Sequence, residues 1–511
     1  MSVARTRVVS LLGLDGAMVE VEADISDGLP GFVIIGLPDT SLGEARDRVR
    51  SAASNSGCPL PPRKLTVNLS PASLPKHGSS FDLGIAVAAL ASGDLLQSES
   101  IERVVHLGEL GLDGRVRPVD GILPAVVGAS RAGARIVMVP FDNVDEASLV
   151  PDVRVVGVAS LRDAAIWHGA DLTPEVVEPL RRPVTRSTPT VQPELAEVIG
   201  NTEAVTALMT AATGGHHLLM VGPPGAGKSM LAARLPGLLP DLDADSALEV
   251  SSVRSLCGVP LSGELETRPP FETPHHSSSA AALIGGGSAR IRPGAISRAS
   301  RGVLFLDEAA EFPATVLDCL RQPLESGEIV IHRSKSVARF PARFQLVLAA
   351  NPCPCGQYGS RDVPCSCSPF MRRRYLGRLS GPLVDRIDMQ IRVNRIGSAQ
   401  FRLSGEPGSD SLTTVAARER VEAARARTAH RLVGTPWRLN AEVSGHWLRS
   451  GDRRLRASET GAIDRALENG SLTMRGYDRV LRVAWSVADL AGEDRPSAEH
   501  IFEALSLRRS L

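Results

Sequence analysis

Lysine is scarce in this chain of 511 residues. Four of the 57 basic residues are lysines, Lys64, Lys76, Lys228 and Lys335, and all the others are arginines. A lysine ammonium is a compact charge whose pKa shifts readily on burial, whereas arginine stays charged. A lysine in this background is therefore a candidate functional residue. For Lys64 and Lys76 we expect a place on the solvated surface, with contact to an anionic partner as the alternative.

The chain also lacks net charge, because 57 acidic residues balance the 57 basic ones. No global field draws it toward nucleic acid, so any basic binding surface must be local. Acidic residues such as Asp15 interrupt the first 26 residues, which excludes a signal-peptide core, and no stretch of 18 apolar residues could span a membrane. Seven cysteines, an odd number, favour reduced thiols. We expect a cytoplasmic protein without a membrane partner.

One stretch of eight residues carries the strongest chemical signal. It consists of Gly222, Pro223, Pro224, Gly225, Ala226, Gly227, Lys228 and Ser229, between an apolar run and a helical pattern. A glycine-rich turn between strand and helix is the setting of a phosphate-binding loop. The glycines let backbone N–H groups approach a phosphate, Lys228 would reach the β- and γ-phosphates, and Ser229 would ligate Mg²⁺. We predict an enzyme that hydrolyses ATP with Mg²⁺.

Polar residues follow two further apolar runs. Asp307 and Glu308 come directly after residues 303–306, roughly 80 residues beyond the phosphate loop. Asp307 would hold Mg²⁺ and Glu308 would polarise the attacking water. Asn351 ends the run 344–350. Its amide could orient that water or sense the γ-phosphate; the alternative is an asparagine that caps its strand.

An arginine that acts on a neighbouring subunit's nucleotide is expected within residues 378–388. Arg386 is the first candidate for such a finger and Arg378 the second. In phosphoryl transfer generally, an arginine supplied in trans accelerates the reaction by ~10³-fold or more. The alternative is a structural arginine paired with Asp385 or Asp388, which flank Arg386.

Element patterns divide the chain into four parts. Residues 1–175 form an N-terminal α/β domain, 176–193 are a proline- and threonine-rich linker, 194–395 contain the ATPase core, and 396–511 form a helical lid. The lid is expected to contain helices at 413–432, 457–469, 474–491 and 497–507. The predicted fold class is therefore α/β.

The N-terminal part resembles the Lon-protease-like domain (ribosomal S5 domain 2-like) that precedes the ATPase in Mg-chelatase-like proteins. The resemblance rests on residues 75–92 and 106–140. Ser79 or Ser80 could stand near the serine of a Lon-type protease. Residues 119–131, where its lysine should come, contain Leu123 and Ala125 but no lysine. A serine without a base is a poor nucleophile, so we interpret the domain as a non-proteolytic module for assembly or partner binding.

The whole chain resembles the YifB/ComM family of Mg-chelatase-like AAA+ ATPases. Six stretches in order carry this resemblance: GGHHLLMVGPPGAGKSMLAARLPGLLP, PHHSSSAAALIGGGS, GVLFLDEAAEF, LRQPLESGEI, ANPCPCG and SGPLVDRID. Ala309 and Ala310 replace the usual Leu-Pro after the acidic pair. The resemblance implies a homo-hexameric ring with ATP between subunits and DNA as partner. It also implies a branch-migration helicase in recombination and natural transformation.

In an AAA+ module the helical lid supplies a second sensor for the nucleotide. Arg475, at the start of the third predicted lid helix, is the candidate. Arg479 and Arg482 follow on neighbouring faces and remain alternatives.

Local basic residues could supply the contact with DNA. Residues 328–340 predict a β-hairpin whose tip contains Arg333 and Lys335, and in a ring this hairpin would point into the pore. Arg290 and Arg292 form a second candidate loop. Contacts of this kind bind phosphates without sequence specificity. A solvated surface is the alternative for both, and residues 372–374, three arginines, could equally serve a subunit interface.

Four cysteines are grouped after Asn351. Cys353, Cys355, Cys365 and Cys367 could bind zinc, although CxC pairs are less typical of zinc sites than CxxC pairs. Free thiols in a loop are the alternative. For His275 and His276 a loop contact is favoured over metal.

Two functions compete with the DNA motor. A chelatase-type ATPase would remodel a protein partner, and an ATP-dependent protease is disfavoured because residues 119–131 contain no lysine. Protein unfoldases usually thread their substrate with an aromatic pore loop. No aromatic residue stands at 333–336, which favours DNA.

Overall fold

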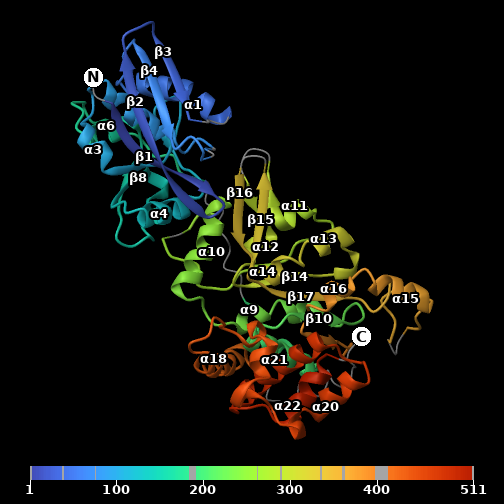
Figure 1. The fold of residues 1–511 in the computed structure, drawn as a ribbon. Helices are drawn as coiled ribbons and strands as arrows, with labels where there is room; N and C mark the ends of the chain where they lie inside the picture. Colours follow the sequence, from blue (N-terminus) through green and yellow to red (C-terminus); the bar gives the residue numbers. More distant parts are fainter. Residues whose placement is uncertain are drawn as a thin grey trace.

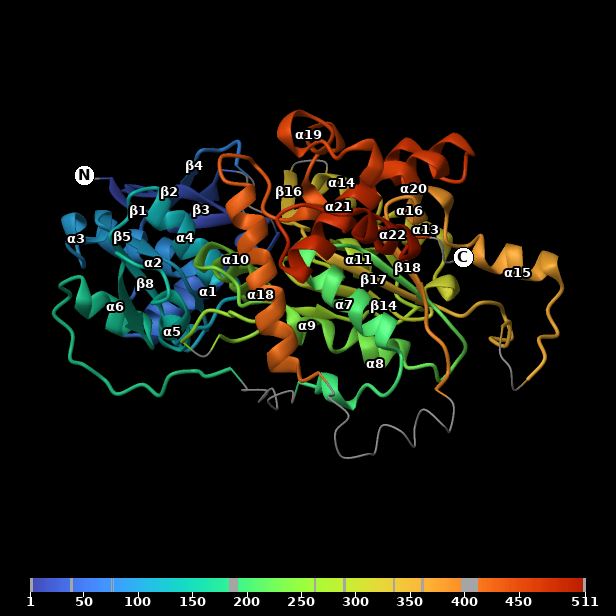
Figure 2. The ribbon, with the colours of Figure 1, turned by 90° about the horizontal axis from the view of Figure 1, so that it is seen from below.

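A computed structural model shows an N-terminal sheet domain beside an ATPase body that is covered by a helical lid (Figures 1 and 2). It describes residues 3–36, 40–74, 76, 78–182, 192–261, 263–287, 291–333, 336–359, 363–396 and 412–508. At 40–43, 333 and 336 only the backbone is described. Lys335 and Arg290 lie outside the described residues, as does part of the predicted linker, 183–191. No described helix is long and apolar enough to cross a membrane.

The N-terminal domain is built on a seven-stranded sheet in the order β3-β4-β2-β1-β5-β8-β9. Leu65, Val67 and Leu69 alternate with more exposed residues along β4, as a strand with one buried face requires. The strands are β1 (Ala4–Leu12), β2 (Asp15–Ser26), β3 (Gly31–Ile35), β4 (Lys64–Ser70), β5 (Val104–His106), β8 (Ile136–Pro140) and β9 (Arg154–Val158), and a separate pair is β6 (Glu109–Leu110) and β7 (Val116–Arg117).

Helix α2 (Asp82–Ser92) fills the centre of this domain, and residues 82–91 are all buried. A Cβ on Gly84 would lie 2.3 Å from a methyl carbon of Val8. The small residues therefore let the helix approach the sheet closely. The other helices are α1 (Thr40–Asn55), α3 (Ser98–Glu102), α4 (Ile122–Arg131), α5 (Val144–Ala147) and α6 (Leu161–Trp167).

Two buried histidines form a hydrogen-bonded chain in this core. His106 Nδ1 lies 2.8 Å from the Thr6 hydroxyl, and His106 Nε2 lies 2.8 Å from His168 Nε2. His168 Nδ1 lies 2.8 Å from the hydroxyl of Ser100. Burial lowers the pKa of His168 to about 4 and the pKa of His106 well below its usual value. Both rings are therefore neutral near pH 7. In a neutral imidazole one nitrogen carries a proton and the other accepts, so one of the two Nε2 atoms can donate a hydrogen bond to the other.

Acid should destabilise the N-terminal domain through this pair. Because the pKa of His168 is lower in the folded state, its contribution is complete above the unfolded pKa of ~6.5 and is lost as pH falls toward 4. We expect a loss of about 2 kcal/mol at pH 5 from His168 alone. Unfolding by urea at pH 7.5 and 5 measures it. His168→Asn should flatten the pH dependence, and substitution of the exposed His446 by Gln should not.

The ATPase body contains a five-stranded parallel sheet in the order β11-β14-β17-β10-β18. β10, β14 and β17 are buried along their whole length, as their apolar runs predict. All carboxyl ends meet at one edge, which positions the residues that follow each strand. The bounds are β11 (Phe271–Glu272), β14 (Val303–Leu306), β17 (Gln345–Ala350), β10 (Leu218–Val221) and β18 (Met389–Arg392).

Short helices and two small ribbons complete the body. The predicted hairpin is confirmed as β15 (Glu328–Arg333) paired with β16 (Ser336–Pro341). The other elements are α7 (Thr202–Gly214), α8 (Lys228–Ala232), α9 (Leu235–Leu238), α10 (Ala244–Leu256), α11 (Ala280–Ile284), β12 (Gly285–Gly286), β13 (Arg292–Pro293), α12 (Ala295–Arg298), α13 (Ala314–Asp318), α14 (Pro323–Ser326), α15 (Pro369–Leu376) and α16 (Gly381–Val384).

The lid packs on the ATPase sheet and shares its core. The four predicted helices are confirmed to within one residue at each end as α18 (Thr414–Arg431), α20 (Ala457–Glu468), α21 (Met474–Ala491) and α22 (Ala498–Ser506); a short α19 (Gly445–Leu448) was not predicted. Inside the lid, Arg431 forms an ion pair of 2.5 Å with the buried Asp489 and lies over the ring of Trp485.

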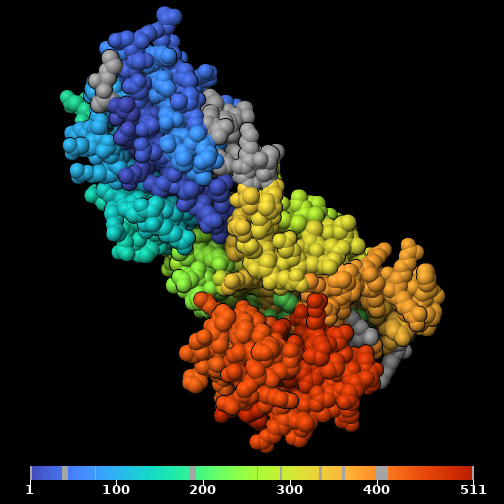
Figure 3. Space-filling view, viewed as in Figure 1, coloured from blue at the N-terminus to red at the C-terminus, as the bar shows by residue number. Residues whose placement is uncertain are grey.

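Among the described residues, the N-terminal domain contacts the ATPase body through its β1–β2 turn and through the start of α4 (Figures 1 and 3). Gly13, in the turn between β1 and β2, forms a bridge with Arg339 of the hairpin, and a Cβ on Gly13 would lie 2.2 Å from the Arg339 carbonyl oxygen. At the second place the N–H of Gly121 donates to the Ser255 carbonyl at 3.0 Å, where α4 packs on α10. The hairpin and α10 therefore both support the N-terminal domain.

One surface expectation is wrong. Lys76 is fully buried, and its ammonium donates to the carbonyls of Gly36 at 2.8 Å and Pro71 at 2.6 Å. Burial lowers the pKa of this ammonium. Lys76 is thus a structural residue that satisfies loop carbonyls and cannot reach an anionic partner.

Candidate functional site

The phosphate loop runs from the end of β10 to the start of α8. Gly225 and Gly227 have φ angles of +75° and +88°, which glycine adopts without steric cost. A Cβ on Gly222 would lie 2.1 Å from the Val393 carbonyl oxygen, so the loop also packs directly on the chain leaving β18. The loop residues from Pro224 onward border a cavity of about 360 Å³.

Lys228 points to oxygen atoms at this cavity. Its ammonium donates to the carbonyls of Gly222 at 2.7 Å and Pro223 at 3.1 Å, and to Asn351 Oδ1 at 3.2 Å. Burial lowers the pKa of Lys228, while the carboxylates of Asp307 and Glu308 oppose that shift. A phosphate oxygen can replace any of these acceptors. The structure therefore brings Asn351 to the lysine, at the carboxyl edge of the sheet.

Two oxygen ligands for Mg²⁺ converge beside the lysine. The Ser229 hydroxyl donates to Asp307 Oδ2 at 2.5 Å, although the two residues come from different elements. Magnesium prefers oxygen ligands and is usually held by one or two protein groups together with nucleotide phosphates. The donor set formed by Ser229 and Asp307 fits that ion.

Glu308 has an unusual backbone conformation. Its φ is +50°, the left-handed region that few residues other than glycine occupy, and its own N–H donates to Asp307 Oδ1 at 2.9 Å. Strain of this kind is concentrated at functional sites. Its carboxylate borders the cavity and lies 3.2 Å from Nδ1 of His276. His276 therefore contacts the predicted catalytic carboxylate.

The predicted finger Arg386 lies near the opposite edge of the sheet. It precedes β18 by three residues, and Met389 of β18 pairs with Leu218, the first residue of β10. The phosphate loop follows the last residue of β10. Arg386 forms an ion pair with Glu325, not with its flanking aspartates, and donates to the Pro382 carbonyl at 2.6 Å. Within one chain it therefore does not border the phosphate cavity.

The candidates for the second sensor lie away from the phosphate cavity of their own chain. Arg475 lies 3.4 Å from Asp385, the residue that precedes Arg386 in the sequence. The side chain of Arg475 is 76% exposed. It does not border the phosphate cavity. Of its alternatives, Arg479 pairs with the buried Asp388, and Arg482 is partly buried. Asp388 directly precedes β18, and its charge acts on Arg482 as well, so all three arginines belong to the edge far from the phosphate loop.

Arg378, the second candidate finger, is occupied locally. It donates to the Ala310 carbonyl and to Glu311, both at 3.1 Å. These acceptors follow the acidic pair at the end of β14.

Two contacts of the phosphate loop were missed by sequence analysis. Arg395 donates from Nε to the Pro224 carbonyl at 2.9 Å. A Cβ on Gly356 would lie 2.6 Å from Cδ of Pro224, so the cysteine-containing loop packs on the phosphate loop as well. Arg395 belongs to none of the motifs, and Gly356 closes the stretch ANPCPCG without any sign that it meets Pro224. Both contacts depend on the close approach of segments that are distant in the sequence.

The four cysteines gather at one point. The sulfur of Cys353 lies 3.4 Å from that of Cys355 and 3.6 Å from that of Cys365, and Cys367 completes the group, all four sulfurs lying within 4.8 Å of one another. Four thiolates around zinc at 2.3 Å would be about 3.8 Å apart, so the spacing suits a tetrahedral ion. A hydrogen bond from the Gln357 backbone lowers the pKa of Cys355 to about 6. The cluster can therefore hold a metal ion.

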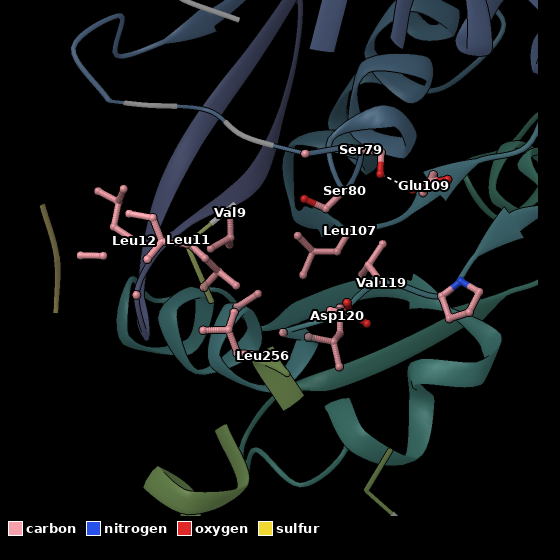
Figure 4. A pocket seen from close by; sticks show the side chains of 18 residues that line it. Val9, Leu11, Leu12, Ser79, Ser80, Leu107, Glu109, Val119, Asp120 and Leu256 are labelled. Carbon is pink, nitrogen blue, oxygen red and sulfur yellow. Dashed lines mark hydrogen bonds between the residues drawn. The ribbon is translucent and has the colours of Figure 1, made fainter. Parts of the chain in front are cut away.

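A cavity of about 290 Å³ marks the place of the protease-like serines (Figure 4). Ser79 and Ser80 line it, and the Ser79 hydroxyl donates to Glu109. Ala125 lines the wall where a lysine would be needed, and Leu256 of the ATPase body closes another side. No lysine is among the described residues that line this cavity. The described lining of this cavity therefore lacks the lysine that a Lon-type protease pairs with its serine.

The candidates for DNA contact have different surroundings. The hairpin β15–β16 rises from the body beside the N-terminal domain (Figure 1), and Arg333 pairs with Ser336 next to its tip. Arg292 instead lies 3.7 Å from Asp120 of the N-terminal domain. This contact partly neutralises Arg292 and makes it the weaker candidate.

Comparison with known proteins covers nearly the whole chain. Family profiles described as "Magnesium chelatase, subunit ChlI", "Subunit ChlI of Mg-chelatase" and "Magnesium chelatase, subunit ChlI C-terminal" match residues 194–401, 21–143 and 411–508. An uncharacterised protein of Mycobacterium tuberculosis is 49% identical over 100% of this chain and 99% of its own. Competence protein ComM of Haemophilus influenzae is 39% identical over 99% and 98%, and YifB of Escherichia coli, also uncharacterised, is 39% identical over 99% and 97%.

Proposed function

We propose, since this chain belongs to the YifB/ComM family of Mg-chelatase-like AAA+ ATPases, that it is a magnesium-dependent, ring-forming motor that moves branched DNA. The observation that supports the ATPase reaction is the convergence of Lys228, Ser229, Asp307, Glu308 and Asn351 on one cavity. The family relationship agrees with an ATPase. The DNA substrate, the helicase activity and the hexamer are the proposed part.

The residues at the cavity divide the hydrolysis between them. Bound ATP and Mg²⁺ supply the γ-phosphoryl group and neutralise the charge that develops on it. Lys228 holds the β- and γ-phosphate oxygens, and Asn351 orients the attacking water. Glu308 accepts a proton from that water as its oxygen bonds to the γ-phosphorus and the bond to the β–γ bridging oxygen breaks. His276, 3.2 Å from Glu308, helps to orient its carboxylate.

A ring explains the location of the arginines. Arg475 of α21 pairs with Asp385, the residue next to Arg386, so both arginines lie at the edge opposite the phosphate loop and are suited to reach the nucleotide of a neighbouring subunit. In such a ring, each ATP site consists of the phosphate loop of one subunit and the arginines of its neighbour.

The hairpin supports DNA as the substrate. Its tip carries Arg333 and Lys335 and no aromatic side chain, which suits phosphate contacts better than the threading of a polypeptide. A relative of known name, ComM, is a competence protein. The second candidate function is an ATPase that remodels a protein partner, and the chelatase-subunit profiles favour it.

DNA should stimulate ATP hydrolysis, and the double substitution Arg333→Ala/Lys335→Ala should abolish most of that stimulation. The expected reason is the loss of two phosphate contacts. Each lost contact should make the slope of log K for DNA against log salt less steep by roughly 0.7–0.9. The measurement is steady-state ATPase rate with and without branched or single-stranded DNA at two salt concentrations.

Arg7→Ala/Arg103→Ala is the matched control, because it removes two exposed arginines from the N-terminal domain. If DNA still stimulates ATP hydrolysis in the hairpin variant, the protein is a DNA motor whose contact with DNA lies outside the hairpin. If no DNA changes the rate of the wild type, the DNA proposal is wrong and a protein partner takes its place.

We further propose that the cysteine cluster binds one zinc ion per chain. Purified protein should contain zinc in equal amount to chain, and Cys355→Ser or Cys365→Ser should lose it. Elemental analysis by mass spectrometry measures the ratio. Cys319→Ser, a cysteine outside the cluster, is the control. Zinc-free wild type prepared without chelators would contradict the proposal.

A further inference from the structure

A cavity of about 340 Å³ borders the first residues of the phosphate loop. Gly222 and Pro223 form part of its wall, whereas the loop residues from Pro224 to Ser229 border the phosphate cavity. The carboxyl end of β18 and helix α15 form other walls. Helix α15 projects from the ATPase body (Figures 1 and 2). The two cavities thus border consecutive parts of one loop.

The charged residues of this second cavity are all basic. Arg372, Arg373 and Arg392 line it, and no carboxylate is among its described lining residues. The guanidinium of Arg372 lies 4.0 Å from the ring centroid of Tyr358, which also lines the cavity. No described carboxylate forms an ion pair with Arg372 or Arg373. The cavity therefore combines a half-exposed aromatic ring, Tyr358, with two arginines, Arg372 and Arg373, that form no ion pair with a described carboxylate.

Apolar side chains cover much of the remaining wall. Leu376, Pro352 and Pro369 border the cavity beside Tyr358. A flat aromatic group fits such walls and can stack on the Tyr358 ring, while guanidinium groups bind phosphate with two hydrogen bonds. A nucleobase that carries a phosphate has both features. Stacking of bases on aromatic residues beside a basic groove is the usual way in which proteins hold a single strand without sequence preference.

We propose that this cavity, the arm pocket, holds one base and its phosphate from a single strand of DNA. The inference rests on the proposed function and names where the strand is held. Tyr358 stacks on the base, and Arg372, Arg373 and Arg392 surround the phosphate. A strand is favoured over a free nucleotide because the rim residues Tyr358, Arg373 and Arg392 are exposed, so a longer chain can enter and leave.

The position of the arm pocket links DNA to hydrolysis. A base held there contacts Gly222 and Pro223, which also accept hydrogen bonds from Lys228. A shift of these carbonyls changes the place of the lysine ammonium. Strand binding can therefore alter the phosphate cavity without a rearrangement elsewhere in the chain.

The test is the binding of a fluorescent oligothymidine to the full chain, followed by anisotropy at several salt concentrations. Tyr358→Ala should weaken binding about tenfold or more, because a base loses its stacking partner, and Tyr358→Phe should retain it. Arg373→Ala should reduce the slope of log K against log salt by ~0.7. Arg374→Ala is the matched control: it changes an exposed arginine of the same helix that does not line the pocket.

Each other outcome separates this inference from the proposed function. Wild-type affinity in Tyr358→Ala and Arg373→Ala would overturn the arm pocket and leave the DNA motor standing. Failure of the wild type to bind any DNA would overturn both. Thymidine monophosphate that competes as well as the oligonucleotide would assign the pocket to a free nucleotide. A change of oligomeric state in these variants at unchanged DNA affinity would make the pocket a contact between subunits.

Discussion

Glu308→Gln should lower ATP turnover by about 10²–10⁴-fold and leave ATP binding intact. The amide has nearly the shape of the carboxylate but cannot accept the proton of the attacking water. Glu308 borders the cavity but makes no hydrogen bond to Lys228 or Ser229, the residues proposed to hold the phosphates and Mg²⁺. The measurement combines turnover with the affinity for a fluorescent ATP analogue.

Glu311→Gln is the control for that substitution. Glu311 stands three residues further along and pairs with Arg378 outside the phosphate cavity, so its amide should leave turnover near the wild-type value. A Glu308→Gln protein with near wild-type turnover would show that another group accepts the proton.

Arg386→Ala should reduce turnover by about 10³-fold or more, and a mixture with Lys228→Ala should recover activity that neither variant has alone. The Lys228→Ala chain has no working phosphate loop but retains Arg386. The Arg386→Ala chain retains the loop. In a mixed ring some interfaces join the intact loop of one chain to the intact arginine of the other.

The mixture therefore distinguishes an arginine that acts on a neighbour from one that acts within its own chain. Turnover is measured after the two variants are mixed and allowed to exchange subunits. Additive, unrecovered activity would exclude action in trans, even if Arg386→Ala alone is inactive through loss of its ion pair with Glu325. The same mixture with Arg378→Ala tests the second arginine.

Local patterns were sufficient for the elements that surround the nucleotide. The phosphate loop follows a strand of four buried apolar residues, and Asp307 and Asn351 each end a similar strand. Parallel strands bring their carboxyl ends to one edge, so the order of these motifs predicts that they meet. The lid helices were equally readable from their 3.6-residue period.

Residues whose role depends on distant contacts were not predictable. Lys76 is a lysine next to a glycine-serine stretch, and only the fold shows that its ammonium meets the Gly36 carbonyl, 40 positions earlier, together with the Pro71 carbonyl of its own loop. Arg292 meets Asp120, 172 positions earlier (292 − 120), because two domains dock there. The pairing of Arg475 with Asp385 likewise follows from the way the lid packs against the start of β18.

The contact between Gly13 and Arg339 gives the N-terminal domain a mechanical consequence. The turn between β1 and β2 fits against the hairpin so closely that a side chain at Gly13 would collide with its backbone. A tilt of the hairpin therefore moves the long strands β1 and β2 as well, because they are in contact with it at Gly13. A displacement at the base is magnified toward β3 and β4, at the far end of that domain (Figure 1). A molecule bound to β3 and β4 would therefore be displaced whenever the hairpin moves.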